Sequence, residues 1–159
     1  MAAPHLSLTL LGWHSPGLIT LLLVFGLPLG WRNAGPPEKA GILILGSIAL
    51  LDLAAWAVMG GALLAHTLID SLALAWLVPL ALKANRHYPA LLAAGFLVAA
   101  STQWLALTGL ATLPRATALI VESGHFVAAL AFLLGWLRHR KGPPGTDQRP
   151  PWRDQLQRK

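Results

Sequence analysis

Four apolar stretches, each long enough to cross a lipid bilayer, dominate this sequence. They cover residues 40–59, 62–82, 89–110 and 116–137. The hydrocarbon core of a bilayer is about 30 Å thick, so a transmembrane helix needs about 20 mainly apolar residues. A fifth stretch, residues 16–31, is shorter and less apolar. The sequence therefore predicts an all-α integral membrane bundle of five transmembrane helices, four strong ones and a weaker first one.

The composition also indicates a membrane protein. Of the 159 residues, 55% are hydrophobic and only 11% are charged, and the mean hydropathy is +0.60. Soluble domains contain roughly 25% charged residues. The chain contains no cysteine, which excludes disulfides, thiolate metal sites, iron–sulfur clusters and thiol nucleophiles. We expect residues 1–141 to form one helical bundle with no separate soluble catalytic domain.

Turn-forming residues separate the four strong stretches. Residues 60–61 are both glycine, Asn85 and Pro89 bracket the next connection, and Gly109 and Pro114 bracket the last. Glycine and proline interrupt helices, and connections this short place consecutive helices side by side. We therefore expect each helix to neighbour the next one along the chain.

The distribution of lysine and arginine predicts the orientation of the bundle. With five spans and an outer N-terminus, the cytoplasmic segments hold eleven of the twelve Lys and Arg residues, and the outer loops hold only Arg115. Cytoplasmic loops of membrane proteins carry such an excess of positive charge. The sequence thus predicts that the N-terminus is outside and the C-terminus is cytoplasmic.

Most of the basic excess follows the last apolar stretch. Arg138, Arg140 and Lys141 are expected to bind the anionic lipid surface. Residues 142–159 are basic and proline-rich, which predicts a disordered cytoplasmic tail, with at most a weak contact of Trp152 to lipid or a partner. Charge confined to one tail does not form a nucleic-acid surface, so we expect no nucleic-acid partner.

Six polar residues lie inside the apolar stretches. An ionisable side chain in a bilayer costs about 2.5–3.5 kcal/mol or more and usually faces the interior of a bundle. Counting about 1.5 Å per residue from the outer helix ends places the acids and the glutamine about 10–12 Å deep, with one histidine above and one below. The six residues are Asp52, His66, Asp70, Gln103, Glu122 and His125. We expect them to form one cluster in the outer half of the bundle.

This cluster has several interpretations. Hydrogen bonds between transmembrane helices contribute about 0.6–2 kcal/mol each and need no ligand. Buried carboxyl groups also exchange protons where water reaches them, so a proton or cation site is an alternative. A metal site is a third interpretation, because Glu122 and His125 have the Glu-x-x-His spacing of di-metal bundles. A haem between His66 and His125 is disfavoured by a depth difference of about 8–9 Å. We predict no cofactor.

A stripe of small residues lies along one side of the last apolar stretch. Its members are Gly124, Ala128, Ala131 and Gly135, spaced four, three and four residues apart. Small side chains at this spacing let another helix approach closely. That helix can belong to the same bundle or to a partner.

Four short motifs are distributed over the spanning region. They are Gly-Pro-Pro-Glu-Lys at 35–39, Ile-Asp at 69–70, Ala-Leu-Lys-Ala-Asn-Arg-His-Tyr-Pro at 81–89 and the basic end at 136–141. Together they resemble a group of small uncharacterised inner-membrane proteins common in alphaproteobacteria. The resemblance covers roughly residues 30–141. It implies a bacterial inner-membrane protein, but no activity and no functional residues.

The sequence therefore predicts a small multi-pass inner-membrane protein that is not an enzyme. We expect an accessory or self-associating subunit whose partners are the lipid bilayer and either another membrane protein or a second copy of the chain. The alternative is a proton- or cation-coupled carrier. In that case Asp70 and Glu122 would be the exchangeable acids, tuned by His66 and His125.

Overall fold

The structure is a computed structural model and contains a bundle of four helices. It describes residues 31, 34–60, 62–110, 114–141 and 152. The helices are α2 (Pro36–Met59), α3 (Leu63–Lys83), α4 (Tyr88–Leu107) and α5 (Pro114–Lys141). All four are long and apolar enough to cross a membrane, and no β-strand occurs among the described residues. The predicted first span, 16–31, lies outside this part of the chain except for Trp31.

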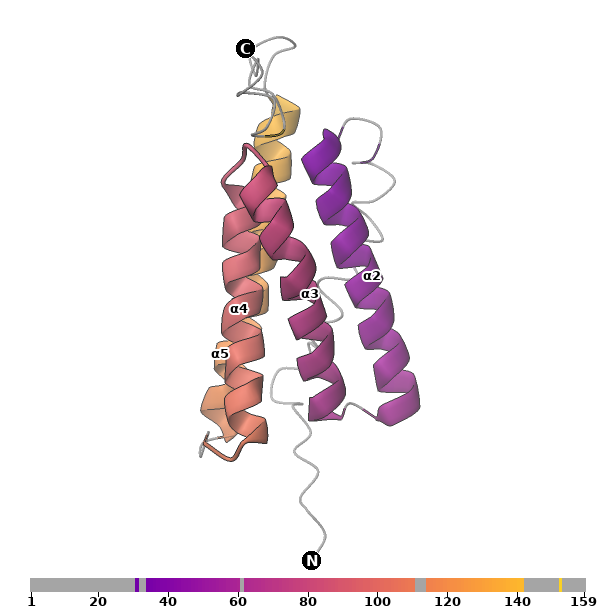
Figure 1. The fold of residues 1–159 in the computed structure, drawn as a ribbon, viewed down its shortest axis with the longest axis vertical. Helices are drawn as coiled ribbons and strands as arrows, with labels where there is room; N and C mark the ends of the chain where they lie inside the picture. The colour runs from indigo at the N-terminus through magenta and orange to yellow at the C-terminus, as the bar shows by residue number, and fades with distance from the viewer. Residues whose placement is uncertain (1–30, 32–33, 61, 111–113, 142–151, 153–159) are drawn as a thin grey trace, which may run out of the picture.

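The four helices alternate in direction and follow one another around the bundle (Figure 1). Each packs on the next along the chain, and α4 and α5 are in the most extensive contact. The expectation that consecutive helices are neighbours is therefore confirmed for the four described helices. The start of α2, the α3–α4 turn and the end of α5 all lie at one end of the bundle, which we call the tail end (Figure 1).

The helix bounds differ from the predicted ones by a few residues at their ends. α2 begins at Pro36, four residues before the predicted start, because proline is tolerated in the first turn of a helix. α4 ends at Leu107 instead of residue 110. Gly109 has a φ of 75°, and the amides of Gly109 and Leu110 bond to the carbonyls of Ala106 and Leu105. This is a Schellman motif, which terminates the helix.

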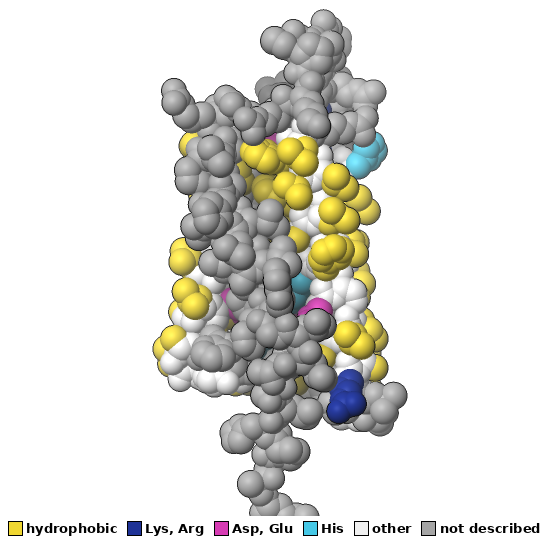
Figure 2. All heavy atoms as spheres, turned by 180° about the vertical axis from the view of Figure 1, so that it is seen from behind, with side chains coloured by type: hydrophobic (Ala, Val, Ile, Leu, Met, Phe, Trp, Pro, Cys, Tyr) yellow, Lys and Arg dark blue, Asp and Glu magenta, His cyan; other side chains and the backbone are white. Residues whose placement is uncertain are grey.

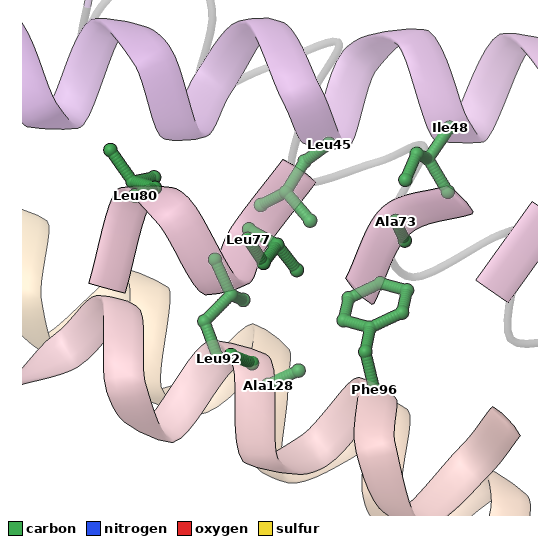
Figure 3. Packing of buried hydrophobic residues seen from close by; sticks show 9 residues of the cluster. Leu45, Ile48, Ala73, Leu77, Leu80, Leu92, Phe96 and Ala128 are labelled. Carbon is green, nitrogen blue, oxygen red and sulfur yellow. The ribbon is translucent and has the colours of Figure 1, made fainter. Parts of the chain in front are cut away.

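An apolar core fills the space between the helices (Figure 3). Leu45 of α2 and Leu77 of α3 face Leu92 and Phe96 of α4, and Ala128 of α5 lies beneath them. Leu77, Leu92 and Phe96 are at most 1% exposed. In contrast, Leu50 is 69% exposed, and such outward leucines match a surface in contact with lipid. Figure 2 shows hydrophobic side chains along the sides of the bundle.

The predicted small-residue stripe is filled by α4 of the same chain. A Cβ on Gly124 would lie 2.6 Å from the carbonyl oxygen of Gly95, and a Cβ on Gly135 would lie 2.5 Å from the ring of Tyr88. Ala128 and Ala131 are also buried. The stripe therefore brings α4 and α5 together and is not open to a partner helix.

Trp152 packs against the bundle, although the sequence placed it in a disordered tail. It forms an isolated antiparallel bridge with Ala84 in the α3–α4 turn. Its ring is partly buried and contacts the apolar core. The gain from covering apolar surface explains this contact. Apart from Trp152, the tail at 142–159 lies outside the described residues.

Candidate functional site

The carboxylate of Asp70 joins three helices in the half of the bundle opposite the tail end. Its Oδ2 accepts a hydrogen bond of 2.9 Å from Nε2 of Gln103 on α4. The same oxygen lies 3.0 Å from Nε2 of His125 on α5. The side chains of Asp70 and His125 are only 8% and 12% exposed. We call Asp70, Gln103 and His125 the Asp70 node.

Asp70 and Gln103 occupy positions of the core-facing stripes of their helices. On α3, Asp70 is followed at helical spacing by the buried Ala73 and Leu77, and on α4, Gln103 follows the buried Ala99. Residues three and four apart lie on one helix face. The side chains of Asp70 and Gln103 therefore point inward, because they continue the apolar faces of their helices. Since both are buried away from water, they form a hydrogen bond with each other.

The imidazole of His125 is held between the carboxylate and an aromatic ring. Phe96 meets it edge to face, with the ring centroids 5.3 Å apart. Nδ1 of His125 and Oε1 of Gln103 are buried and form no hydrogen bond with another described residue. Each atom can therefore still form a hydrogen bond inside the bundle. A buried polar atom without a hydrogen-bond partner lowers stability by about 1–3 kcal/mol.

A second acid–imidazole pair joins α2 to α3. Nδ1 of His66 lies 2.5 Å from Oδ1 of Asp52. These side chains are 22% and 19% exposed, roughly twice the values at the Asp70 node. His66 and Asp70 are four residues apart on α3, so the two groups are about one helical turn apart.

A neutral link lies beside the Asp70 node. Nε1 of Trp104 donates a hydrogen bond of 3.1 Å to Oγ of Ser71, which itself donates to the carbonyl of Thr67. Residues 70–71 of α3 are thus bonded to residues 103–104 of α4. The sequence singled out Gln103 but not the Ser71–Trp104 bond, because serine and tryptophan are common in transmembrane helices and do not stand out in an apolar stretch.

The structure divides the six predicted residues differently from the single layer that depth suggested. Asp52 bonds to His66, while Asp70 bonds to Gln103 and His125. Glu122 is partly buried and makes no hydrogen bond or ion pair with another described residue. Helix depth alone does not give the direction of a side chain. Glu122 is about 60° around α5 from His125, at 100° per residue, and so does not join the Asp70 node.

A buried ion pair at the tail end was not predicted from the sequence. Glu38 is 1% exposed, and its Oε1 lies 3.8 Å from Nε of Arg86 in the α3–α4 turn. Tyr88, at the start of α4, is also buried. Its ring packs edge to face on Phe132, with the ring centroids 6.0 Å apart. The sequence assigned Glu38 and Arg86 to loops, and only the motifs 35–39 and 81–89 marked this region.

The described residues contain no group of three or more His, Asp or Glu side chains placed to hold a metal ion. Instead, two acid–imidazole pairs form, Asp52 with His66 and Asp70 with His125. The absence of a metal or haem remains a prediction for elemental and spectroscopic analysis.

Comparison with known proteins gives no match to a family model, a curated protein or a solved structure.

Proposed function

We propose that this chain is a bacterial inner-membrane protein with five spans, an outer N-terminus and a cytoplasmic C-terminus. Its four described helices are long and apolar enough to span a membrane. Lys39, Lys83 and Arg86 lie at the tail end and Arg115 at the opposite end, which by the positive-inside rule supports a cytoplasmic tail end. Activity of a C-terminal periplasmic reporter fusion would contradict this orientation.

Within the bundle we propose that the two acid–imidazole groups bind and exchange protons. The observation that carries this proposal is that one oxygen of Asp70 faces donors from both α4 and α5, at 2.9 and 3.0 Å. An imidazole takes up and releases protons near neutral pH, and a carboxylate bonded to it favours the protonated form. Ion pairs inside a membrane frequently mark proton relays.

The chemistry requires only proton transfer. With His66 protonated, the Asp52–His66 pair is an ion pair; after His66 releases a proton to water, a carboxylate remains bonded to a neutral imidazole. His125 and Asp70 have the same two states. Because the two groups are about one turn apart on α3, the charge of one affects the other strongly in a low dielectric.

Water would reach these groups more easily from the end opposite the tail end. The Asp52–His66 pair is about one-fifth exposed, whereas the apolar residues Leu77, Leu92 and Phe96 of the buried core lie nearer the tail end along α3 and α4 than Asp70 and Gln103 do. The arrangement of the described residues therefore favours a role in which proton binding changes helix packing over one in which protons cross the bundle. A carrier would need this apolar layer to open.

Infrared titration tests the proposal. In detergent-purified full-length protein, imidazolium bands should appear as the pH is lowered, because the proposed proton acceptors are His66 and His125. Asp70→Asn removes the carboxylate that faces His125 and should therefore reduce the imidazolium signal. Glu122→Gln is the matched control, because it removes an acid that has no bond to another described residue; an equal reduction in this control would contradict the assignment to the Asp70 node.

The accessory or self-associating subunit is the second candidate. Gly46 of α2 has no described atom within 4 Å of a Cβ placed on it, and the neighbouring Ser47 is exposed. A glycine beside a small hydroxyl residue permits close approach of another helix. A single cysteine at Ser47 tests this face: disulfide cross-linking of two chains in membranes supports self-association, and absence of a dimer contradicts it.

A further inference from the structure

An apolar groove runs between α3 and α4 near the tail end. Its volume is about 270 Å³. Val78, Leu82 and Leu97 project outward and are 42–65% exposed, and they form its rims. Small side chains, including the buried Ala93 and the exposed Ala90 and Ala94, line its α4 side. The groove is hollow because alanines on α4 lie opposite long side chains on α3.

The dimensions of the groove match one leaflet of a bilayer. On α3 it extends from Leu74 to Leu82, eight residues or about 12 Å along the helix. One leaflet contributes about 15 Å of hydrocarbon, half of the bilayer core. The groove starts beside the last turn of α3 and so covers most of the depth that an acyl chain of that leaflet occupies.

The end of the groove carries positive charge. Lys83 follows Leu82 directly, is exposed, and forms no ion pair with another described residue. His87, also exposed, lies three residues before Ala90 at the start of α4. Arg86 between them is directed to Glu38. A phosphate at the level of Lys83 would thus meet a cation just where the apolar groove ends.

From this combination we propose that the α3–α4 groove binds one anionic phospholipid, with an acyl chain between α3 and α4 and its phosphate at Lys83. Basic groups beside intramembrane grooves select anionic headgroups, and each contributes about fivefold in affinity near the surface. The site is separate from the Asp70 node and does not depend on the proposed proton exchange.

Native mass spectrometry of the full-length protein tests the site. We expect phosphatidylglycerol to bind more tightly than phosphatidylcholine. Lys83→Gln should weaken phosphatidylglycerol binding about fivefold and leave phosphatidylcholine unchanged, whereas Arg115→Gln, which removes a charge at the opposite end, should change neither. Equal affinities in Lys83→Gln and the unchanged protein would overturn the proposal.

The apolar part of the site has its own test. Ala94→Phe fills the groove and should reduce binding of both lipids, while Ala57→Phe on the exposed face of α2 should not. Because the chain lacks cysteine, a photo-reactive label on Ala94→Cys identifies the occupant. Cross-linking to phosphatidylglycerol in vesicles supports the proposal; cross-linking to another copy or to residues 1–30 overturns it. If Ala94→Phe does not fold, Ala90→Phe gives the same comparison.

Discussion

Asp70 and His125, 55 residues apart in the sequence, meet with 3.0 Å between Oδ2 and Nε2. The contact closes α3 against α5, and Gln103 binds the same oxygen from α4. One carboxylate therefore links side chains of three helices. Its role in packing and its proposed role in proton exchange can be separated experimentally.

Substitution of Asp70 separates hydrogen bonding from charge. Asp70→Asn keeps an acceptor oxygen for Gln103, whereas Asp70→Leu leaves the donors of Gln103 and His125 without it. We expect Asp70→Leu to lower stability by about 1–2 kcal/mol more than Asp70→Asn, measured by thermal unfolding in detergent. Equal stability of the two variants would mean that these bonds contribute nothing to packing.

The contact between α4 and α5 depends on glycine. A Cβ on Gly95 would overlap the carbonyl oxygen of Gly124 and lie 2.9 Å from Cβ of Ala128. Gly95→Ala should therefore destabilise the bundle by about 1–3 kcal/mol. Gly46→Ala is the matched control, because open space surrounds Gly46 among the described atoms and alanine favours a helix by up to about 1 kcal/mol. Similar melting temperatures for both variants would contradict this packing.

The ion pair at the tail end should contribute to stability. Glu38→Gln keeps the size of the side chain but removes the charge that faces Arg86 at 3.8 Å. We expect a loss of about 1–3 kcal/mol in the free energy of unfolding, because Glu38 is almost completely buried. Glu122→Gln should change stability by less than about 0.5 kcal/mol. A stable Glu38→Gln variant would show that burial of the charge offsets its attraction to Arg86.

Trp152 should hold the tail against the α3–α4 turn. Trp152→Ala removes a ring that covers the core beside Ala84, so we expect a loss of about 1–2 kcal/mol and faster amide hydrogen exchange around Ala84. Trp76→Ala serves as the control, because Trp76 is 42% exposed on the lipid-facing side. Unchanged exchange at Ala84 in Trp152→Ala would mean that the contact does not stabilise the turn.

The sequence by itself determined the four described helices and the positions of their turns. Long apolar stretches must form helices in a bilayer, because every backbone amide and carbonyl needs an internal partner there. It also marked Asp70 and Gln103, since buried polar groups stand out in an apolar context, and it identified the face of α5 that packs closely. These are properties of single helices and follow from local chemistry.

Only the tertiary structure decided which of these groups meet. Depth placed Asp52 and Glu122 with Asp70, but the rotation and tilt of each helix direct Asp52 to His66 and leave Glu122 apart. Packing also turned the Gly124–Gly135 side of α5 towards α4 and brought Glu38 to Arg86 across a distance of 48 positions in the sequence. Such pairings depend on relative helix orientation, which is set by the fit of all four surfaces together and not by any one segment.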